Sequence, residues 1–142
     1  MAIYSLGVLT TGTTSATAAW EIRTASTDRI YILELGFFMN AATASTYGFG
    51  RPAAIGVTPT SPVTLIAEDP AAPAGTAQSA LAWGTGPTAP TAFHRRVNTP
   101  ATIGTGIIWT FPRAFIVPVS SSVVLWNLAT NGAVNAYVVE DD

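Results

Sequence analysis

The 142-residue chain contains no cysteine, no lysine and one histidine. The lack of cysteine excludes disulfides, thiolate metal ligands and cysteine nucleophiles. A single histidine excludes a metal site built from several histidines of one chain, and leaves His94 as the one base for a Ser-His-Asp triad. No Gly-x-Ser-x-Gly motif marks a partner serine, and a P-loop would require lysine. We therefore expect a non-enzymatic protein without catalytic, cofactor or metal sites.

Charge is also scarce. Charged residues make up 10% of the chain, against about 25% in typical soluble domains, whereas hydrophobic residues make up 49%. The net charge of −2 and the short basic clusters argue against a nucleic-acid partner. The most apolar stretch, 107–119, is interrupted by Pro112 and Arg113 and is shorter than the ~20 residues of a membrane span. The composition indicates either a surface of small neutral residues or a surface covered by neighbouring subunits.

Period-2 alternation between small-residue turns predicts β-strands along most of the chain, and no convincing helix. Pro112 predicts an edge position or a bulge, and 68–78 reads as a surface loop. We expect one domain over 1–142 with an acidic tail at 140–142, folded as an all-β antiparallel two-sheet sandwich, most simply a jelly roll. The expected strands are 3–9, 19–24, 29–39, 46–51, 63–67, 81–83, 107–111, 114–117, 123–130 and 133–139.

The dipeptide Asn131-Gly132 joins the last two apolar runs. Asn and Gly tolerate the positive φ angles of a type I′ turn, so the pair predicts a two-residue β-hairpin. Counting outward from the turn places Trp126 opposite Tyr137 on one face of the ladder.

Glu34 lies within the run 29–39, which is apolar on both faces and predicts a central, covered strand. A carboxylate buried there needs a partner, because an unpaired buried charge costs several kcal/mol. We expect a buried ion pair between Glu34 and either Arg51 or Arg113.

Two other surfaces are candidates for binding. Trp83, beside a Gly- and Pro-rich loop, is a possible glycan-stacking residue, although tryptophan in such strands more often packs in a core or an interface. His94, Arg95 and Arg96 form a short basic cluster that suits contact with a glycan or a protein partner. A glycan hydrolase would need converging carboxylates. Glu21, Glu34 and Glu68 are the candidates for that arrangement.

Four segments carry a family resemblance: Arg29–Gly36 (RIYILELG), Gly48–Pro52 (GFGRP), Gly104–Pro112 (GTGIIWTFP) and Val124–Asn127 (VLWN). Together they resemble small virion-associated structural proteins of tailed bacteriophages. The resemblance implies a decoration or minor capsid protein, made in the host cytoplasm and located in the virion. It further implies self-association, commonly as trimers, and binding to the major capsid protein or other virion proteins. A tail-associated or receptor- or glycan-binding module is the alternative, and a glycan hydrolase fits less well.

Overall fold

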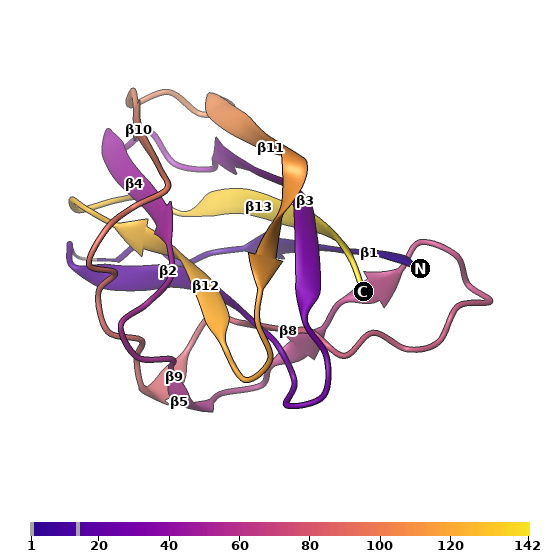
Figure 1. The fold of residues 1–142 in the computed structure, drawn as a ribbon. Helices are drawn as coiled ribbons and strands as arrows, with labels where there is room; N and C mark the ends of the chain where they lie inside the picture. The colour runs from indigo at the N-terminus through magenta and orange to yellow at the C-terminus, as the bar shows by residue number, and fades with distance from the viewer. Residues whose placement is uncertain (1, 14) are drawn as a thin grey trace.

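The computed structural model describes residues 2–13 and 15–142, and this part of the chain contains no helix. Two antiparallel sheets pack as a sandwich, which confirms the predicted fold class (Figure 1). The five-stranded sheet has the order β11 (Gly106–Val117), β3 (Ile30–Met39), β13 (Val134–Asp141), β1 (Ile3–Leu9) and β7 (Ile66–Ala67). The six-stranded sheet has the order β10 (Arg95–Thr99), β4 (Ser45–Gly50), β12 (Ser122–Asn127), β2 (Thr17–Arg23), β8 (Gln78–Ala80) and β6 (Val63–Thr64). A separate ribbon joins β5 (Val57–Pro59) to β9 (Trp83–Thr85).

The longer strands pair in a nested manner. Strand β1 pairs with β13 and β2 with β12, while β3 pairs with β11 and β4 with β10. A chain that first forms one long hairpin and then rolls up gives this pairing. Most consecutive strands therefore lie in different sheets, and the large connection between β4 and β10 carries the short strands.

A single large core fills the space between the sheets. Phe37 of β3 stands at the centre, with its ring 4.9 Å from that of Tyr47 and 5.4 Å from that of Trp109. Edge-to-face aromatic pairs of this kind add about 0.5–1.5 kcal/mol beyond the burial of their area. The main core residues are Ile22, Ile32, Leu35, Phe37, Tyr47, Phe49, Trp109, Leu125 and Val138.

A bulge in β3 explains why the run 29–39 is apolar on both faces. Ile32 pairs with Glu140 and Glu34 pairs with Val139, so Leu33 is an extra residue. The extra residue reverses the alternation, as bulges do. The core-facing residues of β3 are Ile30 and Ile32 before the bulge and Leu35, Phe37 and Met39 after it. Strand β11 has its own register shift between Thr110 and Phe115 and lies at the sheet edge, which confirms the prediction from Pro112.

The predicted hairpin at Asn131-Gly132 is wrong. Strand β12 lies in the six-stranded sheet and β13 in the five-stranded sheet, so Trp126 and Tyr137 do not pair. Neither Asn131 nor Gly132 has a positive φ. All positions of β12 are buried, and its neighbours are β2 and β4. The demand for burial on both faces outweighs the local turn preference.

Polar side chains instead fix the segment between β12 and β13, where the chain passes from one sheet to the other. The buried Asn131 donates through its amide nitrogen to Asn127 Oδ1, and its own Oδ1 accepts from the Thr13 backbone N–H at 3.1 Å. The amide of Asn127 donates in turn to Thr13 Oγ1. On the other side, the Tyr47 hydroxyl donates to the Gly132 carbonyl at 3.0 Å. The asparagine therefore acts through its side chain rather than through its backbone conformation.

We predict that Asn131→Ala lowers the free energy of unfolding by about 1–3 kcal/mol, because buried partners lose their hydrogen bonds. The matched control is Asn98→Ala, which removes an exposed hydrogen bond to Thr46 and costs less than about 1 kcal/mol. Urea denaturation of both variants measures the difference. Equal losses in the two variants would contradict the role given to Asn131.

Candidate functional site

The connection 51–94 covers the outer face of the six-stranded sheet. Trp83 and Phe93 pack there against Val124 and Trp126. Gly48 makes room for this packing, since a Cβ at that position would lie 2.4 Å from the Phe93 ring. This face is therefore filled by the chain itself, and little of it is left for a partner.

Glu21 lies beneath the same connection and is fully buried. Its carboxylate accepts hydrogen bonds from Trp83 Nε1 at 2.6 Å, Ser122 Oγ at 2.7 Å and the Gly56 backbone N–H at 3.0 Å. Arg23, in the same strand, completes an ion pair at 3.4 Å. From the alternation in β2 alone, Glu21 would face solvent. No local pattern indicates that the connection 51–94, which is distant in sequence, covers it.

Glu34 does not form the expected ion pair with Arg51 or Arg113. It lies on the outer face of the five-stranded sheet, where the Tyr137 hydroxyl donates to its Oε1 at 2.5 Å. Burial, reinforced by the hydrogen bond and the negative charge of Glu34, raises the pKa of Tyr137 to about 12. The bulge at Leu33 turns Glu34 outward, and so removes the need for a buried cation.

The other carboxylate and aromatic candidates are also separated. Glu21 and Glu34 lie on the outer faces of different sheets, and Glu68 is an exposed residue just after β7. The three side chains proposed for glycan hydrolysis therefore do not converge. Trp83 uses its indole N–H to bond Glu21 and is half-buried, so only part of its ring surface faces solvent.

The outer face of the five-stranded sheet is left uncovered. We call it the open face and define it by Leu9, Tyr31, Phe38, Ile108, Ile116 and Tyr137. Strand pairing places Phe38, Asn135 and Leu9 side by side in one row across the sheet. In the next row on this face, Tyr137 lies between Gly36 and Gly7. Leu9 of β1 and Ile108 of β11, on the two outer strands of the four long ones in this sheet, are 52% and 50% exposed. A groove of about 430 Å³ runs over Gly7 between Leu9, Phe38 and Tyr137.

The sequence-predicted basic residues gather at one corner, which we call the basic edge: Arg51, His94, Arg95, Arg96 and Arg113. Arg51 donates to His94 Nε2 at 3.0 Å and to the Ile116 carbonyl at 2.6 Å. Its guanidinium also stacks on the Phe115 ring, 4.2 Å from the centroid. Partial desolvation, together with the positive charges of Arg51 and Arg95, lowers the pKa of His94, which favours the neutral imidazole that can accept from Arg51.

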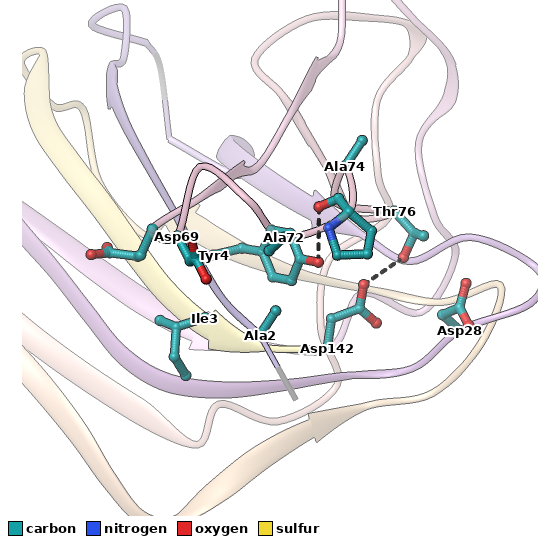
Figure 2. A pocket seen from close by; sticks show the side chains of 11 residues that line it. Ala2, Ile3, Tyr4, Asp28, Asp69, Ala72, Ala74, Thr76 and Asp142 are labelled. Atoms are coloured by element: carbon teal, nitrogen blue, oxygen red, sulfur yellow. Dashed lines mark hydrogen bonds between the residues drawn. The ribbon is translucent and has the colours of Figure 1, made fainter.

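A cavity of about 780 Å³ lies at the opposite side of the sandwich, between the start of β1, the end of β13 and the loop that follows β7. Figure 2 shows Asp28, Asp69 and Asp142 around it. The Tyr4 hydroxyl donates to the Pro73 carbonyl at 3.2 Å, and the Thr76 hydroxyl donates to Asp142 at 3.2 Å (Figure 2). We call this region, with Glu68, the acidic edge.

Glu140 is buried close to the acidic edge. The residues expected to form an acidic tail begin inside β13, where Glu140 pairs with Tyr4 and is fully buried. Neither carboxylate oxygen has a hydrogen-bond partner. Burial, with the charges of Asp142 and Asp141 adding to it, raises the pKa of Glu140 to about 8. The raised pKa favours the neutral, protonated form of Glu140 in the folded protein.

Comparison with known proteins gives no family: no family model, curated protein or solved structure matches the chain. Within residues 2–13 and 15–142, no helix is long and apolar enough to cross a membrane. The same residues contain no cluster of three or more His, Asp or Glu side chains placed to hold a metal ion.

We predict that Glu21→Ala lowers the free energy of unfolding by about 3–5 kcal/mol, because buried donors and Arg23 lose their acceptor. Glu34→Ala is the matched control, since it removes one hydrogen bond on the open face and costs less than about 1.5 kcal/mol. Thermal and urea unfolding give both values. A loss for Glu21→Ala no larger than that for Glu34→Ala would refute the role of this carboxylate.

We predict that the stability difference between wild type and Glu140→Gln depends on pH. The pKa of Glu140 is higher in the folded state than the ordinary value of 4.5, so its stabilising contribution is full below pH 4.5 and declines until about pH 8. The decline is at most about 1.4 kcal/mol per pH unit. The glutamine side chain does not titrate, so the variant gains on wild type as pH rises from 5 to 8. Urea denaturation across that range would show a constant difference if Glu140 were not protonated.

Proposed function

We propose that this chain is a non-enzymatic structural protein of a phage particle, a capsid decoration or minor capsid protein that associates with itself and with the head shell. The observation that carries the proposal is the open face. One sheet is covered by the chain's own connection 51–94, whereas the other presents exposed Leu9 and Ile108 beside half-buried Phe38 and Tyr137. Contiguous apolar surface of this kind is typical of sites that bind other proteins.

The size of the open face suits such a contact. Spacings of ~4.8 Å between strands and ~3.4 Å per residue give the four long strands an area of roughly 20 by 25 Å, or about 500 Å² in flat projection. Side-chain relief increases this area toward the ~800 Å² that each partner buries in a standard interface. The low charge of the chain agrees with surface that becomes buried in an assembly.

Topology also supports the proposal. We propose a jelly-roll connectivity, which fits the nested pairing of β1 with β13, β2 with β12, β3 with β11 and β4 with β10. Jelly rolls are common in viral capsid proteins. The resemblance to phage virion-associated proteins points to the same setting, in which the chain is made in the host cytoplasm and joins the particle. The glycan-binding alternative receives less support, because Trp83 is half-buried against the six-stranded sheet and only part of its ring is free to stack on a sugar.

We predict that Ile108→Asp on the open face weakens binding to purified heads that lack this protein by at least about tenfold, because a charge is desolvated in an apolar contact. Val63→Asp is the matched control, since Val63 of β6 is 51% exposed but belongs to the other sheet. Cosedimentation of labelled protein with heads measures both affinities. Wild-type protein that does not bind heads, or equal binding by the two variants, would overturn the proposal.

A further inference from the structure

Charged side chains are concentrated in two regions of the sandwich, the basic edge and the acidic edge. The strand orders place β11 and β10 at one edge of their sheets and β7 and β6 at the other. The basic edge holds the sole histidine and four of the six arginines, all exposed. The acidic edge holds Asp28, Glu68, Asp69 and Asp142. In Figure 1, β10 lies far from the loop beside the chain termini that forms the acidic edge. Arg95 and Arg96 of β10 therefore lie far from Glu68 and Asp69, whereas Arg113 is next in sequence to Ala114, which lines one groove with Asp142.

The basic edge is ordered before any partner binds. Arg95 donates to the His94 carbonyl at 2.9 Å, and its guanidinium lies 5.5 Å from the Phe111 ring centroid. Arg96 is 5.9 Å from the ring centroid of Phe93. Guanidinium groups held on aromatic faces lose less rotamer freedom on binding, and each keeps further N–H donors for carboxylates. This edge is built to receive several carboxylates at once.

The acidic edge offers carboxylates around a concave surface. The exposed Asp69 accepts only a local hydrogen bond from the Ala71 N–H, at 2.9 Å, and Glu68 beside it is also exposed. Asp142 accepts from Thr76 through one oxygen. The exposed Arg29 adjoins this edge and reduces its negative charge by one. A carboxylate has about four lone-pair sites, so these groups retain capacity for arginine donors.

We propose that the partner of each edge is a second copy of this chain: the basic edge of one copy docks on the acidic edge of the next. This deepens the proposed structural role, on which it rests, by naming the partner and the contact. A two-fold contact between identical edges would oppose like charges, whereas a head-to-tail contact pairs Arg95 and Arg96 with carboxylates. Head-to-tail contacts close into rings when the rotation between copies permits it. Such a ring leaves the open face free for the shell.

Charge reversal tests this contact. Arg95→Glu/Arg96→Glu reverses two charges and cancels the positive charge of the basic edge, because Arg51 and Arg113 remain there. Glu68→Arg/Asp69→Arg likewise cancels the charge of the four carboxylates of the acidic edge, because Asp28 and Asp142 remain. All four substituted residues are exposed, so both variants are expected to fold, which circular dichroism checks. Thr60→Glu/Thr85→Glu is the control, because it adds negative charge at exposed positions of the β5–β9 region, away from both edges.

Analytical ultracentrifugation at about 50 and 500 mM NaCl gives the result, because high salt screens exposed charge pairs. We expect wild type and the control to associate at low salt, and at least about tenfold more weakly at high salt. Each reversed variant alone is expected to be monomeric, and an equimolar mixture of the two to associate again. A monomeric wild type, variants that associate as wild type does, or a mixture that stays monomeric would overturn the inference.

Head binding separates this inference from the proposed function. Salt-sensitive association of wild type without binding to heads would leave the edge contact standing and remove the role in the particle. A monomeric wild type that binds heads through Ile108 would remove the edge contact and leave the role in the particle standing.

Discussion

The buried carboxylate of Glu21 is the interaction on which the arrangement of the surfaces depends. It receives hydrogen bonds from β12 through Ser122, from β9 through Trp83 and from the loop residue Gly56, and it is paired with Arg23. A buried carboxylate without such partners would cost several kcal/mol. The connection 51–94 must therefore dock on the six-stranded sheet for Glu21 to be tolerated there. Its docking in turn closes that face.

The closure of one face gives the molecule its asymmetry. With the six-stranded sheet covered, the exposed apolar side chains of Leu9 and Ile108 remain on the other sheet. The charged side chains lie away from this apolar surface. The arginines of the basic edge lie around β10 and the bulge of β11, and the carboxylates of the acidic edge lie around the start of β1 and the end of β13. The open face, the basic edge and the acidic edge are three distinct surface regions, which suits the proposed subunit with more than one partner.

Local patterns located most of the long strands but not their partners. Alternation locates β1 and β11, and Pro112 correctly indicates an edge with a bulge. The preference of Asn131-Gly132 for a tight turn misleads, because the pairing of β12 is decided by burial on both its faces. Strand β10 escapes detection because Arg95 and Arg96 break the apolar pattern that a half-buried strand would show.

The candidate surfaces were predicted only in part. The sequence alone predicts a contact role for His94, Arg95 and Arg96, and this role stays a prediction. The place of Arg51 beside them depends on a fold that brings β4 beside β10. The outward orientation of Glu34 depends on one extra residue, Leu33, and the burial of Glu21 on a segment distant in sequence. None of these long-range effects has a local signature.

Hydroxyl-radical footprinting of purified particles tests most directly whether the open face is covered in the virion. We expect Phe38 and Tyr137 to be labelled in the free chain and protected in the particle, whereas labelling of Trp83, on the face that the chain covers itself, stays the same. Equal labelling of Phe38 and Tyr137 in both states, or the absence of this chain from the particles, would contradict a structural role for the open face.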